Sequence, residues 1–525
     1  MAVLTRERAL TRGTEIALID EFGETAWAAL DARVNALVHA LRGLGLKAGD
    51  TLAVVLGNRR EWFEVALACA HGGFVYVPVN WHWVADELAY VFQDAQAAAV
   101  VVEPRYAEAV AVALRDPRGA GVRAVIAIGG AEKDALREEP RAASYEALIA
   151  AAPAHEPEDQ AMGGPMFYTS GTTGRPKGVR GALAAARGVP PEMLQMMGAS
   201  FTRFFPIPGR TLLCGPFYHS AQWAFSFLPL AAGSSVVMQH KFDAAGVLDL
   251  IDRCGVTNLH LVPTQMKRLL DLPADVKARF SGRSLAIAIH GAAPCPPAVK
   301  RGMIEWWGEK ISEYYGSTEG SIISLITAPE WLAKGGSVGK PSEMVEVLVI
   351  GDDGRPVPPG TDGQLYFRNL SGADFVYHND PEKTAAAHLA PGVFTTGDVG
   401  RIDADGYLWL SDRKIDMIIS GGVNIYPAEI EGVLNAHPAV EDCAVIGVPD
   451  EEYGESVKAI VVAKPDAIPG AALAAELIAH CRVLLAGYKA PRSVDFIDAI
   501  PRSAAGKIQK KPLRDPYWRG AERRI

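Results

Sequence analysis

The chain has 525 residues, more than the roughly 250 to 300 at which one hydrophobic core stops growing, so we expect at least two domains. Its 49% of hydrophobic and 22% of charged residues are ordinary for a globular protein and exclude the disordered and fibrous classes. A net charge of -9 excludes the broad basic surface of nucleic-acid-binding proteins, so no nucleic-acid partner is expected.

Helices and strands alternate along the first part of the chain. Apolar residues recur at helical spacing over residues 30–41, and a β-rich stretch at 51–56 follows the turn at 47–50. A second helical stretch, residues 61–70, leads to another apolar run at 74–79. Such alternation is typical of parallel sheets covered by helices, so the predicted fold class is α/β.

The pattern changes later in the chain. A helix that begins at Pro427 is followed by an alternating strand at 457–463 and by a helix with apolar residues from Leu473 to Leu484. This is enough for a separate α+β domain. We therefore predict a large N-terminal domain of helix-covered sheets, residues 1–412, and a small mobile α+β C-terminal domain, residues 413–525, joined by a short hinge.

Compartment and membrane signals are sparse. The six cysteines are scattered, without a CxxC pair or the spacing of metal ligands, which is typical of proteins in a reduced compartment. The start of the chain lacks the apolar core of a signal peptide, and no window holds about 18 consecutive apolar residues. We therefore expect a cytoplasmic protein without a membrane span.

One segment has the chemistry of phosphate binding. In the string YTSGTTGRPKGV, residues 168–179, glycines alternate with hydroxyl residues and one lysine, so backbone N–H groups, hydroxyls and an ammonium group can converge on phosphate oxygens. The string is not the GxxxxGK[ST] loop, and its glycines alone are equally consistent with a plain turn. The candidate ligand-binding residues are Thr169, Ser170, Gly171, Thr172, Thr173, Gly174 and Lys177.

The whole string resembles the phosphate-binding motif of the adenylate-forming superfamily, which contains acyl-CoA synthetases, firefly luciferase and peptide-synthetase adenylation domains. The resemblance implies that an adenine-stacking tyrosine with a Thr-Glu pair, a ribose-binding aspartate, a hinge arginine and a late catalytic lysine follow in that order. All of them are present, in YGSTE at 315–319, TTGD at 395–398, SDRK at 411–414 and GK at 506–507.

In YGSTE, the resemblance implies that the ring of Tyr315 stacks on adenine, with Gly316 beside it. It further implies that Thr318 contacts the α-phosphate and that Glu319 holds Mg²⁺. The chemistry is consistent, because a flat base suits a flat ring and a hard cation that bridges phosphates prefers carboxylate oxygen.

Three later residues have implied roles around the ribose and the reacting phosphate. Asp398 would accept hydrogen bonds from both ribose hydroxyls, and Arg413 would lie beside the ribose at the hinge. Lys507 would reach the active site during adenylation and neutralise the charge that develops as one anion attacks another. Without its place in this series, Lys507 would be interpreted as a solvated surface lysine.

Further candidates line the adenine and the acyl group. The resemblance places Gly291, Ala292 and Ala293 against the second face of adenine. Glu313 stands where the family often has Asn or Asp, and its carboxylate could accept from the adenine amino group. His219, in an aromatic-His motif, would lie near the carboxylate and the thiol, although a buried structural histidine is the alternative. A second departure from the family is Ile415, which leaves open which hinge residue absorbs the domain rotation.

The sequence signals for the acyl-binding pocket and for the path of the thiol are less specific. The stretch 217–230 is aromatic and uncharged beyond its histidine, which favours an apolar carboxylate, with a plain core helix as the alternative. Gly421 and Gly422 match the loop that lines the pantetheine tunnel of the family's CoA ligases. Lys489 and Arg492 are candidate contacts for the phosphates of CoA.

The resemblance therefore implies an ATP-dependent acyl-CoA synthetase that uses ATP, Mg²⁺ and coenzyme A and acts on a small-molecule fatty or aryl carboxylic acid. The alternative is an acyl-adenylate-forming enzyme with another second step, either transfer to a carrier protein or a luciferase-like oxidation. From a different class, a catalytically silent nucleotide-binding protein is the remaining option. The sequence leaves the acyl group and the oligomeric state open, with a homodimer as one possibility.

Overall fold

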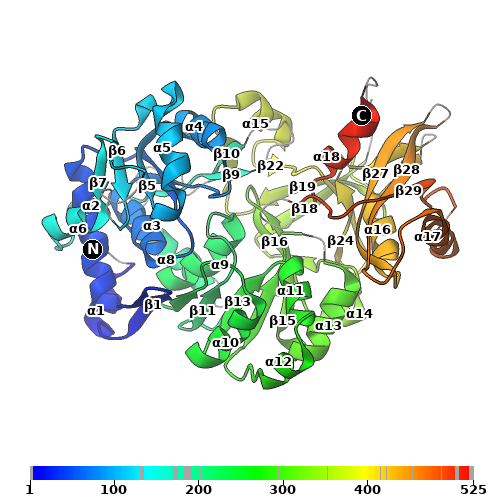
Figure 1. Ribbon diagram of the computed structural model, residues 1–525, viewed down its shortest axis with the longest axis horizontal. Coiled ribbons are helices and arrows are strands. Elements are labelled where there is room, and N and C mark those ends of the chain that lie inside the picture. Colours follow the sequence, from blue (N-terminus) through cyan, green and yellow to red (C-terminus); the bar gives the residue numbers. More distant parts are fainter. Residues whose placement is uncertain are drawn as a thin grey trace.

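The computed structural model describes residues 4–129, 135–169, 176–181, 192–200, 204–293, 295–351, 353–413, 416–420, 423–450, 453–485, 487–502 and 508–519. Figure 1 shows the early part of the chain on the left, a second helix-covered sheet in the middle and the C-terminal part of the chain, coloured orange to red, on the right. Within these residues, no helix combines the length and apolar character that crossing a bilayer requires.

The first sheet has the strand order β7-β6-β5-β3-β4-β8, with every neighbouring pair parallel. Strands β3 to β6 are buried at every position, which explains why they read as continuous apolar runs. The strands are β3 (Thr51–Val55), β4 (Val75–Pro78), β5 (Ala97–Val102), β6 (Ala124–Ala127), β7 (Ala142–Ser144) and β8 (Gly164–Pro165). The helices in this part are α2 (Trp27–Gly43), α3 (Arg60–Gly72), α4 (Ala85–Asp94), η1 (Pro104–Tyr106), α5 (Ala107–Arg115), η2 (Pro117–Gly121) and α6 (Tyr145–Ala151).

The second sheet has the order β17-β16-β15-β14-β13-β11-β12-β1-β2. It is parallel from β1 to β15 and antiparallel at both edges. Its strands are β1 (Ile16–Asp20), β2 (Gly23–Ala26), β11 (Arg210–Leu213), β12 (Ser235–Met238), β13 (Asn258–Leu261), β14 (Ile287–His290), β15 (Ile311–Ser317), β16 (Ser321–Thr327) and β17 (Lys340–Pro341). The accompanying helices are α1 (Arg6–Thr11), α8 (Glu192–Ser200), α9 (Ser220–Ala231), α10 (Ala244–Cys254), α11 (Pro263–Leu270), α12 (Ala274–Arg279), α13 (Pro297–Trp307), η5 (Gly308–Lys310) and α14 (Ala328–Ala333).

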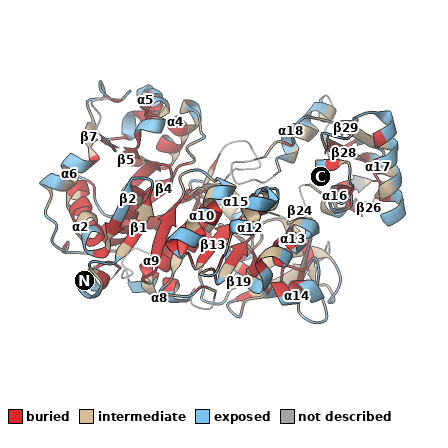
Figure 2. Cartoon of the chain, turned by 60° about the horizontal axis from the view of Figure 1, so that its bottom comes forward, coloured by how far each residue is buried: buried red, intermediate tan, exposed pale blue. Residues whose placement is uncertain are grey.

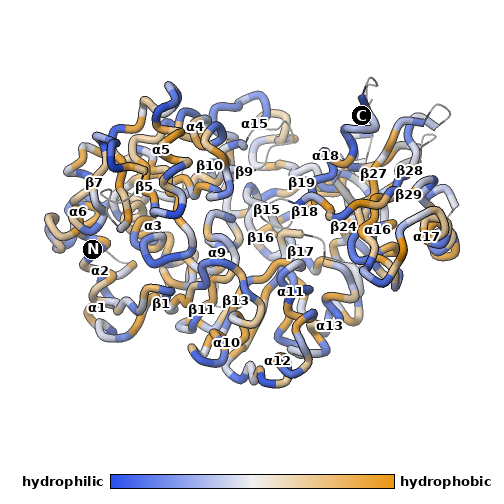
Figure 3. Tube along the Cα trace, in the orientation of Figure 1, coloured by the Kyte–Doolittle hydropathy of each residue, from blue (hydrophilic) through white to orange (hydrophobic). Residues whose placement is uncertain are grey.

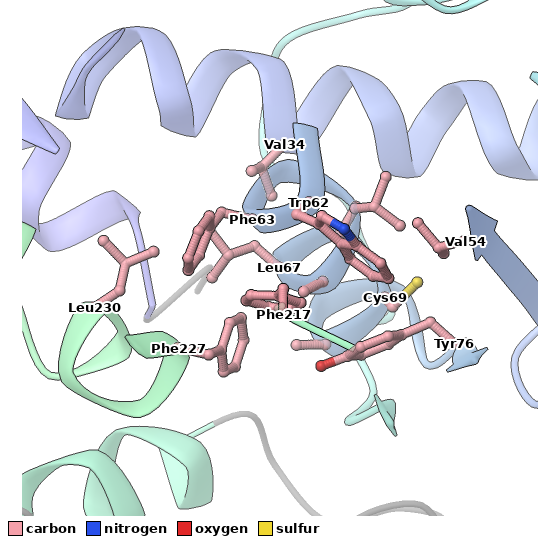
Figure 4. Packing of buried hydrophobic residues seen from close by; sticks show 14 of the residues in the cluster. Val34, Val54, Trp62, Phe63, Leu67, Cys69, Tyr76, Phe217, Phe227 and Leu230 are labelled. Atoms are coloured by element: carbon pink, nitrogen blue, oxygen red, sulfur yellow. The ribbon is translucent and has the colours of Figure 1, made fainter. Parts of the chain in front are cut away.

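A continuous aromatic core joins the two sheets. Figure 4 shows Trp62 and Phe63 of α3 around Phe217, with Phe227 of α9 alongside. The rings of Trp62 and Phe217 stack with centroids 4.8 Å apart. Each buried aromatic side chain of this kind stabilises the fold by about 1.5–3 kcal/mol. Figure 2 shows the same concentration of buried residues around β1 and α9. The segment that follows β11 is therefore firmly anchored.

Two antiparallel sheets complete the large domain. The first has the order β20-β10-β9, and the second has the order β21-β22-β19-β23-β24 with β18 paired to β19. Their strands are β9 (Phe167–Thr169), β10 (Lys177–Gly181), β18 (Val345–Ile350), β19 (Gly363–Asn369), β20 (Phe375–Tyr377), β21 (His388–Ala390), β22 (Val393–Phe394), β23 (Asp398–Ile402) and β24 (Leu408–Arg413). Helix α15 (Pro381–Ala387) follows β20.

The C-terminal part forms its own sheet and core. The order is β26-β25-β28-β27 with β29 paired to β28, and Figure 3 shows an apolar stretch around β27. The core contains Ile430, Cys443 and Leu477. The elements are β25 (Ile418–Ser420), β26 (Val423–Ile425), α16 (Pro427–Asn435), β27 (Val440–Asp450), β28 (Gly454–Ala463), α17 (Ala471–Leu484), β29 (Ser493–Phe496), α18 (Lys510–Arg514) and η6 (Asp515–Trp518).

The predicted fold class is confirmed, with a large domain of helix-covered sheets and a small α+β domain. Strand β24 of the large domain ends at Arg413, and the first strand of the small sheet begins at Ile418. The boundary between residues 412 and 413 stays a prediction. One detail differs from the expected apolar face of α17: Leu484 is 57% exposed, because it is the last residue of the helix.

Candidate active site

The candidate residues gather where parallel strands end. The segment 291–293 directly follows β14, and the string YGSTE closes the neighbouring strand β15. Ligands of α/β proteins bind at the carboxyl ends of such strands. Packing requires a glycine at position 291, because a Cβ there would lie 2.4 Å from Cε1 of Tyr314. Ala292 has a φ of 67°, a left-handed conformation that costs about 1–3 kcal/mol in a residue with a side chain and is often found at functional sites.

Tyr315 and Asp398 are brought together from different sheets. The hydroxyl of Tyr315, at the end of β15, donates to Asp398 Oδ2 at 2.5 Å, although the two residues are 83 positions apart. Thr396 Oγ1 donates to the same oxygen at 2.7 Å. Both residues are half-buried, so they are held in position and still border solvent. A flat ring next to a carboxylate can contact a base and the hydroxyls of its sugar together.

Thr318 is coupled to the start of helix α9. Its hydroxyl lies 2.9 Å from Ser220 Oγ, in the first turn of the helix that His219 precedes as N-cap residue. The preceding segment is fixed by buried Asn58, whose amide donates to Gly215 O at 2.8 Å and whose Oδ1 accepts from the N–H of Phe217 at 3.0 Å. His219 is thus held near the YGSTE segment, and Asn58 is a positioning residue that no sequence motif indicated.

The described part of the phosphate string lies on the small sheet. Thr169 ends β9 and pairs with Lys177 at the start of β10. The ammonium group of Lys177 lies 3.4 Å from Asp380 Oδ2. On the adjacent strand β20, the hydroxyl of Tyr377 donates to Glu319 Oε1 at 3.0 Å. The sheet therefore connects the phosphate string with the predicted magnesium ligand.

Glu313 forms an unexpected buried ion pair. Lys300 Nζ donates to Glu313 Oε2 at 2.5 Å, and the lysine is only 1% exposed. Burial raises the pKa of Glu313 and lowers that of Lys300, while the attraction between the pair acts in the opposite direction on both groups. Lys300 stands on the buried stripe of α13 together with Met303 and Ile304. A lysine between apolar residues of a helix is the signal in the sequence for such a buried pair.

Lys383 is a further residue that no sequence motif indicated. It lies in the first turn of α15, where a cation is disfavoured by the helix dipole. Its Nζ lies 4.3 Å from the centroid of the Tyr377 ring. The sequence contains a signal for Lys383, which is a lysine in an unfavourable helical position. It gives no information about the ring that this lysine covers, because the ring comes from a strand.

Several predicted residues lie outside the described residues or only partly within them. The backbone of Arg413 pairs with Asp398 across β23 and β24. The predictions for the remaining residues concern undescribed positions: Ser170, Gly171, Thr172, Thr173, Gly174, Ile415, Gly421, Gly422 and Lys507.

Two sequence-based candidates have other contacts. Lys489 binds the carboxylate of Glu429 at 2.7 Å and 2.8 Å, and Arg492 Nη1 lies 3.4 Å from Asp450 Oδ2. A phosphate of CoA would have to displace these carboxylates from the two cations. Most of the aromatic stretch 217–230 lies in α9, and the stretch contributes Phe217, Phe225 and Phe227 to the core, so packing accounts for much of its aromatic character.

A magnesium ion fits this site only together with a nucleotide. Among the described residues, no group of three or more His, Cys, Asp or Glu side chains is arranged to hold a metal. Glu319 contributes one carboxylate, which is half-buried beside Tyr377. Protein sites commonly bind Mg²⁺ through one or two carboxylates plus phosphates of the substrate, so this donor set suits a nucleotide-bound ion.

The comparison with known families matches residues 5–373 to "AMP-binding enzyme" and residues 429–507 to "AMP-binding enzyme C-terminal domain". The chain is 35% identical to feruloyl-CoA synthase of Amycolatopsis sp, over 93% of each chain. It is 32% identical to fatty acid--[acyl-carrier-protein] ligase ScoC of Streptomyces coeruleorubidus, over 94% of this chain and 91% of that one. The solved structure of amide bond synthetase McbA from Marinactinospora thermotolerans has a TM-score of 0.83 at 29% identity and covers 98% of this chain and 100% of that chain.

Proposed function

The chain belongs to the AMP-binding enzyme family, and on that premise we propose that it is an ATP-dependent carboxylate–CoA ligase that acts through an acyl-adenylate. The observation that carries the proposal is the hydrogen bond between Tyr315 and Asp398 at the carboxyl edge of the second sheet. It joins a ring suited to adenine and a carboxylate suited to ribose, and Thr318 and Glu319 follow Tyr315 in the same motif.

In the proposed first half-reaction, ATP binds with adenine between the ring of Tyr315 and the segment 291–293. Asp398 accepts from the ribose hydroxyls, and Thr318 donates to the α-phosphate, on which the carboxylate attacks. The contact between Ser220 Oγ and Thr318 Oγ1, in which either hydroxyl can donate, supports this role, because it holds the threonine hydroxyl in place. Because the reactants are held in this geometry on binding, the entropy loss of a bimolecular encounter does not add to the barrier of the chemical step.

Magnesium, when bound with ATP, would neutralise phosphate charge, and Glu319 is the residue that we propose to hold it. Tyr377 orients that carboxylate by donating a hydrogen bond to one of its oxygens. The other carboxylate oxygen then has a defined direction. Thr169 and Lys177 border the same sheet edge and are proposed to bind phosphate, together with residues 170–174.

The small domain, for which we propose residues 413–525, would supply Lys507 and take part in the second half-reaction. Lys507 would serve adenylation only. The small domain would then rotate, with Gly421 and Gly422 lining the path of the CoA thiol towards the acyl-adenylate near His219. Arg413, next to the backbone of Asp398, is proposed to contact the ribose at the hinge.

The acyl group is proposed to be an apolar aryl or fatty acid. Helix α9, which begins beside His219, has Gln222, Trp223 and Phe225 among its buried residues and no charged side chain. An amino acid substrate would require a buried acidic partner for its ammonium group. The buried Glu313 already has Lys300 as its partner. The name of the feruloyl-CoA synthase relative also favours an aryl acid.

A panel of carboxylates tests the proposal, with pyrophosphate release and thioester formation measured separately. We expect aryl or fatty acids to release pyrophosphate and, when CoA is added, to form the CoA thioester. The relative ScoC motivates one competing outcome, in which a phosphopantetheinylated carrier protein replaces CoA as the acceptor. Pyrophosphate release without a CoA thioester, for every acid in the panel, would contradict the CoA ligase assignment.

A further inference from the structure

Two lysines border one face of the small sheet formed by β9, β10 and β20. In the antiparallel pairing of β10 with β20, Val179 lies opposite Tyr377. Side chains alternate along a strand, so Lys177, two residues before Val179, projects to the same face as the Tyr377 ring. The ammonium group of Lys177 lies 3.4 Å from Asp380 Oδ2, shortly after the end of β20.

Lys383 approaches this face from helix α15, which Figure 1 shows above β10. Asp380 caps the helix, with its Oδ1 accepting from the N–H of Lys383 at 3.0 Å. The ammonium group of Lys383 lies 4.3 Å from the centroid of the Tyr377 ring, within cation–π range. The hydroxyl of the same tyrosine donates to Glu319, so this ring connects Lys383 with the proposed magnesium ligand.

The two ammonium groups repel each other. Burial and then the neighbouring charge of Lys177 lower the pKa of Lys383 to about 8, whereas Glu319 and Asp380 act to raise it. Asp380 compensates only in part, because one of its oxygens caps the helix and the other lies 3.4 Å from Lys177, longer than a strong charge-assisted bond. A polyanion between the lysines would turn this repulsion into attraction on both sides.

We propose that Lys383 joins Lys177 in binding the β- and γ-phosphates of ATP, the part that leaves as pyrophosphate. This inference rests on the proposed function. In adenylation, a carboxylate oxygen forms a bond to the α-phosphorus, and the bond from that phosphorus to the oxygen bridging to the β-phosphate breaks. The electron pair remains on that oxygen. The two ammonium groups neutralise the charge that accumulates there, and no proton has to be transferred.

Pyrophosphate binding measured by calorimetry tests this inference without catalysis. The titrations use the full chain with and without Mg²⁺ at pH 7 and pH 9. Lys383→Gln removes the charge, Lys383→Arg retains it at both pH values, and Lys47→Gln is the control at an exposed lysine in the turn before β3. The titrations contain no CoA, so they test phosphate binding separately from thioester formation. A wild-type protein that binds pyrophosphate but forms no CoA thioester in the carboxylate panel would contradict the proposed function and leave this inference standing.

We expect Lys383→Gln to weaken pyrophosphate binding about tenfold at pH 7, the effect of one hydrogen bond to a charged group. At pH 9 the loss should shrink towards no change, because the free wild-type protein has then lost most of the charge on Lys383. The arginine variant and Lys47→Gln should bind like the wild type at pH 7. Equal affinities of wild type and Lys383→Gln at pH 7 would overturn the proposal, as would an equal loss at both pH values.

Discussion

Replacing Lys300 by methionine should destabilise the large domain by about 3–5 kcal/mol, the loss typical of a buried ion pair that has lost one partner. The pair is enclosed, with Lys300 1% and Glu313 8% exposed, and Nζ lies 2.5 Å from Oε2. Without the ammonium group, the carboxylate must remain ionised in an apolar surrounding or take up a proton. Burial already raises the pKa of Glu313, and the lysine is the group that opposes this rise.

Urea unfolding followed by tryptophan fluorescence measures the effect, since Lys300 Nζ lies 4.9 Å from the ring centroid of Trp331. The double variant Lys300→Met, Glu313→Leu is the matched control, because it removes both charges and leaves apolar groups of similar size. We expect it to recover most of the lost stability, so a double-mutant cycle gives a large coupling energy. A single variant that unfolds at the wild-type urea concentration, or a double variant as unstable as the single one, would refute this reasoning.

Two further predictions concern the nucleotide and the reaction, and a third concerns stability. Lys507→Ala should block pyrophosphate release, while a supplied acyl-adenylate is still converted to its CoA thioester; equal loss of both half-reactions would contradict the assigned role. Tyr315→Phe removes the 2.5 Å bond to the ribose-side aspartate and should raise the KM for ATP in pyrophosphate exchange by about three- to tenfold, with the KM for the acid unchanged. Gly291→Ala should lower stability in thermal unfolding by about 1–3 kcal/mol, because its Cβ would lie 2.4 Å from Tyr314. Gly432→Ala is the control, because a Cβ at this position meets nothing within 4 Å, and we expect no loss of stability. A similar melting temperature for the Gly291 and Gly432 variants would argue against the steric reason.

Periodicity predicted the elements well, because burial imposes it on the sequence. The run predicted as helical, residues 61–70, lies within α3 (Arg60–Gly72), and the stretch 51–56 contains β3 (Thr51–Val55). Both elements are almost completely buried, so their apolar residues are continuous in the sequence. Leu484 was assigned to the apolar face of α17 by the same rule, but a helix terminus lacks the neighbours that bury such a residue.

Partners across the fold could not be predicted from local patterns. The bond between Tyr377 and Glu319 joins residues 58 positions apart, and the bond between Lys300 and Glu313 joins a helix to a strand. Motif resemblance identified Glu319 and Glu313 as candidates, yet it carried no information about the groups that hold them. Pairs of this kind depend on strand order and register, which single-sequence periodicity does not specify.

The two proposed half-reactions would require the small domain to change its orientation, and one ion pair between the domains is compatible with such a change. Lys267 of α11 lies 2.9 Å from Glu441 of β27, and both side chains are about 40% exposed. Exposed ion pairs contribute only about 0–1 kcal/mol, so breaking this one costs little. The described residues that we propose to contact the nucleotide, in contrast, come from large-domain strands, including β15, β20 and β23. In the proposed mechanism, rotation would replace Lys507 at the site by the path of the CoA thiol, while Tyr315 and Asp398 keep the adenylate in place.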